Sequence, residues 1–116
     1  MSKTQAIFIH GGTVFETREK YYRYLKNKEY NPFEVKKRWS EYLMEQLGEK
    51  VVFFSPQMPA KQDADYIAWQ IWFEKLFPFL QSENVILIGS SLGTIFLSKY
   101  LSENTFPRTI QSLHLV

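Results

Sequence analysis

The most informative stretch of the chain is Asn84-Val85-Ile86-Leu87-Ile88-Gly89-Ser90-Ser91-Leu92-Gly93-Thr94. An apolar run ends there in a turn of the form G-x-S-x-G, and apolar residues with helical spacing follow, so the pattern predicts a strand, a sharp turn and a helix. Glycines at 89 and 93 let the backbone approach closely, so Ser91 would stand exposed above a sheet, in the position of a nucleophile. N–H groups at the start of the helix would stabilise negative charge on a substrate oxygen beside it.

The same turn has two alternative interpretations. Small residues after a strand also form phosphate-binding turns or plain tight connections. A phosphate site is disfavoured because the turn lacks the Gly-Lys-Ser/Thr ending of a P-loop, and a dinucleotide-binding glycine pattern is expected after the first strand rather than the third. The order of strand, turn and helix is the context that a nucleophile requires.

Composition narrows the class of protein. The 116 residues are 45% hydrophobic and 17% aromatic, which predicts one packed domain, and a net charge of +2 argues against nucleic acid or an anionic membrane as a partner. The chain has no cysteine and two histidines, so neither a metal site nor a cofactor is expected. The first apolar run is too short for a signal peptide or a membrane span, which predicts a cytoplasmic protein.

The predicted strands and helices alternate along the chain. Apolar runs without alternation predict strands at 6–9, 51–54 and 85–88, of which the first two are expected to be buried, and the 110–116 segment predicts a fourth strand. Helical patterns and caps predict helices at 16–30, 31–48, 64–77 and 92–102. The fold class is therefore α/β, a three-layer sandwich with a mostly parallel sheet of about four strands, in a single domain over residues 1–116.

The first three predicted helices differ in character. The 16–30 segment is charged and rich in tyrosine, which predicts a surface helix, either laid on the body of the domain or covering part of a pocket. Asn31 caps a core-facing helix in which Trp39 packs. The 64–77 helix, capped by Asp63 or Asp65, is apolar on more than one face, so it is covered on two sides or forms a contact surface.

Two loops are expected at the same sheet edge. His10-Gly11-Gly12-Thr13 follows the first strand, and the Ser91 turn follows the third, so both lie beyond the carboxyl ends of parallel strands, where ligands bind in open α/β sheets. The loop after the second strand holds Met58, which either lines a pocket or belongs to a purely structural loop.

These motifs together resemble the front part of an α/β-hydrolase of the compact branch without a lid. The matching segments are Ile7-Phe8-Ile9-His10-Gly11-Gly12, Met58-Pro59 and Ile86-Leu87-Ile88-Gly89-Ser90-Ser91-Leu92-Gly93. The resemblance implies a serine hydrolase acting on a small-molecule acyl substrate, an ester, thioester or amide. It implies the following roles: Ser91 as nucleophile, backbone N–H groups of Leu92 and of Gly12 or Gly11 as oxyanion hole, and His10, Thr13, Ser90 and Met58 as candidate pocket lining.

The sequence departs from that family's order of Ser, Asp or Glu, then His. After Ser91 it has no aspartate, one glutamate, Glu103, and one histidine, His114, inside the last predicted strand. His114 is either a base or an ordinary strand residue, and His10 either replaces the base or only shapes the oxyanion loop.

We therefore expect an incomplete triad and a chain truncated at its C-terminus. The exposed edge of the 110–116 strand would pair with a missing C-terminal segment or with a second copy, or the fragment would be marginally stable. The alternative function is an inactive binding module, in which an aromatic surface at Trp69, Trp72 and Phe73 engages a protein partner.

Overall fold

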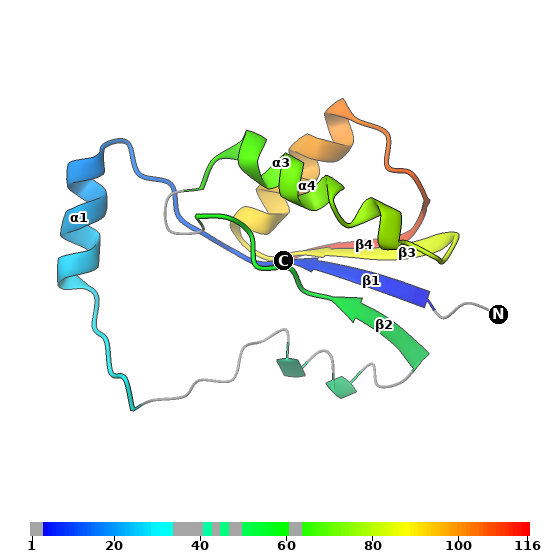
Figure 1. Cartoon of the computed structure of the whole chain (residues 1–116), viewed down its shortest axis with the longest axis horizontal. Helices are drawn as coiled ribbons and strands as arrows, with labels where there is room; N and C mark the ends of the chain where they lie inside the picture. The colour runs from blue at the N-terminus through cyan, green and yellow to red at the C-terminus, as the bar shows by residue number, and fades with distance from the viewer. Residues whose placement is uncertain (1–3, 34–40, 43–44, 47–49, 61–63) are drawn as a thin grey trace.

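The computed structural model describes residues 4–33, 41–42, 45–46, 50–60 and 64–116 (Figure 1). Its four strands are β1 (Thr4–Ile9), β2 (Val51–Phe54), β3 (Asn84–Gly89) and β4 (Thr109–Leu115). They form one all-parallel sheet in the order β2-β1-β3-β4. The described helices are α1 (Arg18–Asn27), α3 (Tyr66–Glu74), the 3₁₀ turn η3 (Phe77–Phe79) and α4 (Leu92–Glu103). The α/β class and the parallel four-strand sheet are confirmed.

The two central strands are buried and the two outer strands are not. All of β1 from Gln5 to Ile9 is buried, as the continuous apolar run predicts. The prediction that β2 is equally buried is wrong, because β2 is an edge strand: three of its residues are half-buried and Val52 is 38% exposed. β4, at the other edge, is exposed or half-buried along its length.

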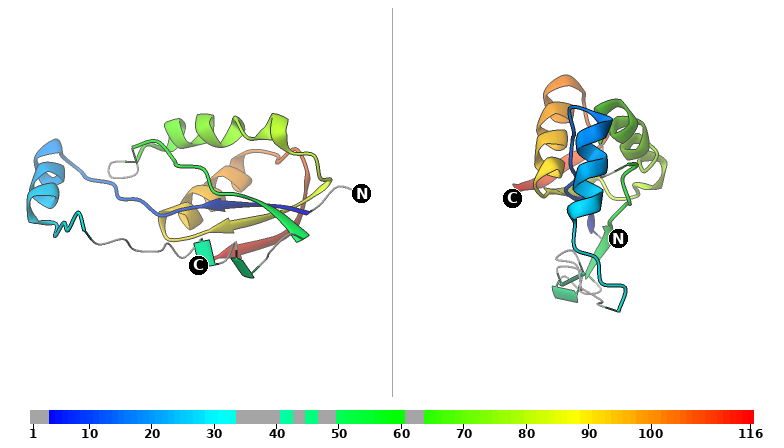
Figure 2. Two further views of the ribbon diagram at one scale, coloured as in Figure 1. Left: turned by 60° about the horizontal axis from the view of Figure 1, so that its bottom comes forward. Right: turned by 90° about the vertical axis from the view of Figure 1, so that its left-hand side faces the viewer.

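The strand order places α3 and α4 on one face of the sheet (Figures 1 and 2). The chain moves from β1 outward to β2, then crosses back over β1 to β3 and on to β4. Right-handed crossovers in these two directions use opposite faces, so the β2–β3 and β3–β4 helices share a face. The predicted 31–48 helix belongs to the other crossover, and most of it, Trp39 included, lies outside the described residues.

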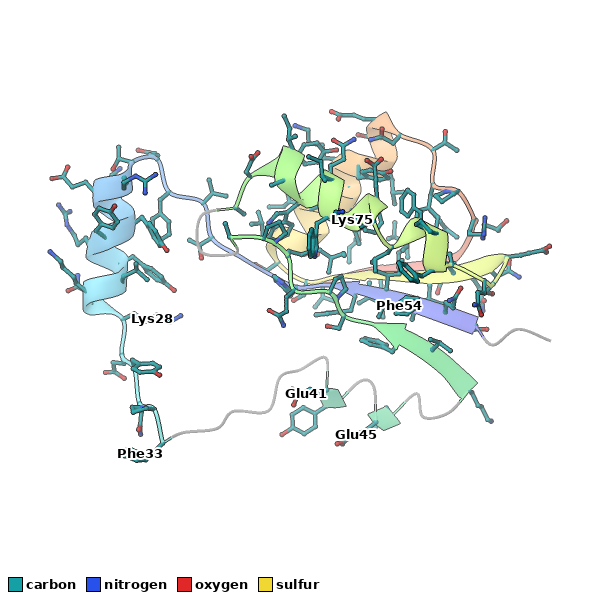
Figure 3. The ribbon with its side chains drawn as sticks, in the orientation of Figure 1. Lys28, Phe33, Glu41, Glu45, Phe54 and Lys75 are labelled. Atoms are coloured by element: carbon teal, nitrogen blue, oxygen red, sulfur yellow. The ribbon has the colours of Figure 1, made fainter. Side chains whose placement is uncertain are left out.

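An aromatic core fills the space between the sheet and the two helices (Figure 3). Trp69 and Phe73 are one helical turn apart on α3 and are 1% and 0% exposed, with Phe73 packed edge-on against Phe96 and Tyr100 of α4. They cannot form the predicted aromatic contact surface, because the four-residue spacing turns both inward. Trp72, on the outer side, is 43% exposed.

The α1 helix lies apart from the sheet (Figures 1 and 2). Thr17 caps it by accepting a hydrogen bond from the N–H of Lys20, and none of its residues is buried. Phe15 packs beside it against Tyr21 and Tyr24. The prediction of a surface helix is confirmed, but the expectation that it lies on the body of the domain is wrong. No helix in the described part of the chain is long and apolar enough to cross a membrane.

Candidate active site

Ser91 lies at the junction between β3 and α4, in an unusual backbone conformation. Its φ is 55° and its ψ is −117°, and its side chain makes no capping hydrogen bond. A positive φ in a residue with a Cβ is sparsely populated and costs about 1–3 kcal/mol, and such strain clusters at functional sites. Ser91 is also exposed. The turn therefore presents the hydroxyl to solvent in a strained conformation.

The two glycines of the turn are required by close backbone contacts. A Cβ on Gly89 would lie 2.8 Å from the carbonyl oxygen of Gly93. A Cβ on Gly93 would overlap the carbonyl oxygen of Ile9 and lie 2.8 Å from that of His10. The first turn of α4 is thus pressed against the end of β1, which only glycine permits.

Hydrogen bonds hold the turn to both neighbouring strands. The N–H of Ser90 donates to the carbonyl of Ile9 at 3.1 Å, and the N–H of Ser91 donates to that of Val116 at 3.0 Å. The hydroxyl of Thr94 lies 2.9 Å from the carbonyl oxygen of Gly89 and 3.0 Å from that of Val116. Sequence reasoning missed this role of Thr94, although a hydroxyl three residues after the serine is well placed to bond back to the turn.

The loop after β1 lies directly beside Ser91. A Cβ on Gly11 would be 3.2 Å from the Cβ of Ser91 and 3.6 Å from its Oγ. The two loops that the sequence places at one sheet edge therefore do meet there. They follow β1 and β3, which are neighbours in the sheet. The connection after β1 leads to one side of the sheet and the connection after β3 leads to the other, and ligands bind in α/β sheets at such a topological switch point.

Three backbone donors at this junction make no hydrogen bond to another described residue. In α4, the N–H of Gly93 donates to Ser90 and that of Thr94 donates to Ser91. The N–H groups of Leu92, Gly11 and Gly12, by contrast, have no acceptor among the described residues. These are the donors that the resemblance assigns to an oxyanion hole.

His10 has both ring nitrogens engaged. Its Nε2 accepts the backbone N–H of Met58 at 2.9 Å, so the proton must be on Nδ1, which donates to the carbonyl of Gly11 at 2.6 Å. His10 is thus neutral and holds the glycine loop in place. The alternative in which it replaces the missing base is wrong, because neither nitrogen can take a proton from Ser91.

The remaining candidate residues make no hydrogen bond to Ser91 in the described part of the chain. Glu103 is the last residue of α4, about 18 Å along the helix from its start. His114 pairs in register with Ile88, on the opposite face of the sheet from the core residue Leu87, and its Nε2 lies 3.0 Å from the Oγ of Ser112. Met58 is 4% exposed and packs in the core.

A cavity of about 130 Å³ adjoins the turn on the side of the two helices. Its lining residues come from three segments of the chain and are Val14, Ala64, Asp65, Tyr66, Trp69, Leu92, Ile95, Phe96 and Lys99. Leu92 belongs both to the cavity wall and to the set of unused donors. The cavity is not lined by His10, Thr13, Ser90 or Met58, which were the predicted lining residues.

The fold and the site define a small parallel α/β domain with an exposed, strained serine at its topological switch point. No family model, no curated protein and no solved structure matches this chain. The sheet order and the geometry of the turn are therefore the basis on which its function is inferred.

Proposed function

We propose that this chain is a serine hydrolase domain of the α/β-hydrolase type, with Ser91 as its nucleophile and a carboxylic ester or related acyl compound as its substrate. The observation that carries the proposal is the placement of Ser91. Its backbone is strained, the residue is exposed, and its Oγ lies 3.6 Å from where a Cβ on Gly11 would stand. The order of the motifs supports the same class, since the His-Gly-Gly loop, the second strand and the G-x-S-x-G turn follow one another as in that family.

The reaction has two halves. The Oγ of Ser91 bonds to the acyl carbon, the bond from that carbon to the alcohol oxygen breaks, and the proton of the serine ends on the departing alcohol. Water then bonds to the same carbon, the bond from that carbon to the Oγ of Ser91 breaks, and one proton of the water ends on Ser91 as the acid leaves. In both halves the negative oxygen would accept hydrogen bonds from Leu92 and from Gly11 or Gly12.

The proton of Ser91 has no acceptor within the described residues. None of their side chains hydrogen-bonds to the Oγ of Ser91, and His10 is fully engaged. In the chain on its own, a buffer base or hydroxide must take this proton. We therefore expect the rate of Ser91 acylation to rise steadily with pH, without the plateau above pH ~6.5 that a histidine base gives.

A fluorophosphonate probe tests the proposal. The Oγ of Ser91 displaces fluoride from phosphorus, so the intact protein should gain the mass of one phosphonyl group, and fragmentation should place it on Ser91. Ser91→Ala should abolish the modification. Ser90→Ala is the matched control, because it removes the neighbouring hydroxyl and should leave the labelling unchanged. Labelling that persists in Ser91→Ala would end the proposal.

The alternative, a binding module without activity, is favoured by a different observation. The outer side of α3 exposes Ile67, Ile71 and Trp72 at 64%, 56% and 43%. Apolar side chains grouped on one helix face are typical of protein contacts. Absence of Ser91 labelling in the folded chain, combined with weaker binding of a protein partner in Trp72→Ala, would favour this function over hydrolysis.

A further inference from the structure

The cavity beside Leu92 presents hydrocarbon to whatever enters it. The indole N–H of Trp69 already donates to the carbonyl of Pro59 at 2.8 Å. The carboxylate of Asp65 caps α3 by accepting the N–H of Ile67 at 3.1 Å, and the ammonium of Lys99 lies 4.3 Å from the centre of the Tyr66 ring. The polar groups of these three wall residues are therefore engaged, and the hydroxyl oxygen of Tyr66, the fourth polar residue of the wall, is itself buried. A charged ligand group would lose its water at this wall without gaining equivalent partners.

The volume of the cavity sets the size of its ligand. It measures about 130 Å³. An engineered apolar cavity of about 150 Å³ in another protein stays dry and binds benzene. The cavity beside Leu92 therefore suits a phenyl ring or a chain of roughly four to six carbons, and a longer chain would have to leave it.

The location of the cavity connects it to the reacting carbonyl. Leu92 lines it, and the N–H of the same residue would bind the carbonyl oxygen. The alcohol must escape to solvent after the first half of the reaction, whereas the acyl group stays attached to Ser91 until water releases it. A partly enclosed apolar site next to the serine is accordingly better suited to the acyl group than to the alcohol.

We propose that this cavity is the acyl-binding site and that it selects esters of small, uncharged apolar acids. This inference rests on the proposed function, since it assigns the substrate class of the same serine. The selection follows from burial of the acyl chain. Each methylene that enters the cavity leaves water, so it should raise the second-order rate constant for acylation of Ser91 about fourfold. Beyond about six carbons the rate should stop rising and then fall.

Alkyl fluorophosphonates measure this selection at Ser91. We would compare the labelling rates of a series in which the alkyl group on phosphorus lengthens from methyl to decyl. The wild-type rate should increase up to butyl or hexyl and decrease for octyl and decyl.

A pair of tryptophan variants distinguishes blockage of the cavity from the general effect of adding a large side chain to the surface. Ile95 lines the cavity and Ile67 does not, yet both are helical isoleucines that are 64% exposed. Ile95→Trp should narrow the cavity and slow the hexyl reagent at least tenfold more than the methyl reagent. Ile67→Trp should alter neither rate.

The outcomes distinguish the two proposals. Labelling of Ser91 at a rate independent of chain length, or equal losses in both tryptophan variants, would overturn the acyl-site inference and leave the hydrolase proposal standing. If no reagent modifies Ser91 in the folded protein, both proposals fail together. Circular dichroism of each variant confirms that the folded state is being compared.

Discussion

Replacement of Ser91 by glycine should stabilise the protein while removing its nucleophile. The residue has φ 55° and ψ −117°, a conformation that glycine adopts freely and a serine does not. The serine side chain makes no capping hydrogen bond, so its loss leaves no described partner unsatisfied. Relief of backbone strain is therefore the dominant effect in the folded state.

The expected gain follows from two opposing quantities. Strain of this kind costs about 1–3 kcal/mol, and a glycine makes the unfolded chain more flexible, which offsets about 0.4–1 kcal/mol of the relief. The net effect of Ser91→Gly is a gain of about 1 kcal/mol, or roughly 4 °C in melting temperature. Ser91→Ala keeps a Cβ and therefore the strain, so its stability should equal that of the wild type.

Urea denaturation of four proteins measures the effect: the wild type, Ser91→Gly, Ser91→Ala and Ser90→Gly. Ser90 has no positive φ, so glycine there should cost about 0.5–1 kcal/mol through chain flexibility alone. Ser91→Gly should accordingly be more stable than Ser90→Gly by about 2 kcal/mol. If the two glycine variants have equal midpoints and equal slopes, Ser91 is not strained and the reasoning is refuted.

Three further predictions concern neighbouring contacts. Gly93→Ala should lower the free energy of unfolding by at least about 3 kcal/mol, since its Cβ meets backbone carbonyls that cannot move aside, and a urea midpoint within experimental error of the wild type would contradict this. A Cβ at Gly11 would lie 3.2 Å from the Cβ of Ser91 and 3.5 Å from the carbonyl oxygen of Ser90, so Gly11→Ala should change stability by less than about 1 kcal/mol but slow labelling of Ser91 at least tenfold, as measured by mass spectrometry. Burial and the Glu74 carboxylate raise the pKa of Tyr100 above 10, so the folded state holds its proton more tightly and stability should fall as pH rises above 10. Tyr100→Phe should remove about 1 kcal/mol of that fall between pH 10 and 11, and an unchanged slope of stability against pH would count against the assignment.

The parallel sheet could be predicted because its strands carry a distinctive pattern. The runs at 6–9 and 85–88 are apolar at every position, and this pattern is typical of a strand covered on both faces. The burial of β2 could not be predicted in the same way. Val51–Phe54 is equally apolar, but the run does not reveal that β2 lies at the sheet edge.

The two loops of the candidate site were predictable and its side-chain details were not. Parallel strands share a carboxyl edge, which brings Gly11 and Ser91 together whatever the sequence between them. The protonation state of His10 depends instead on the N–H of Met58, 48 residues away. The cavity likewise needs Val14, Tyr66 and Leu92 from three separate segments, and no local periodicity signals such a convergence.

The strain at Ser91 persists because the backbone around it is fixed by several independent contacts. The flanking residues are bonded to β1 through Ser90 and to β4 through Thr94, and the contact between Gly89 and Gly93 prevents the turn from opening. Relaxation of φ at this one residue would break those interactions, each worth about 1 kcal/mol, so together they offset a strain of about 1–3 kcal/mol. A turn that served only to connect a strand to a helix would gain stability by placing glycine at position 91. That a serine occupies this position, with Gly11 of a second loop directly beside it, is what the hydrolase proposal explains and a purely structural turn does not.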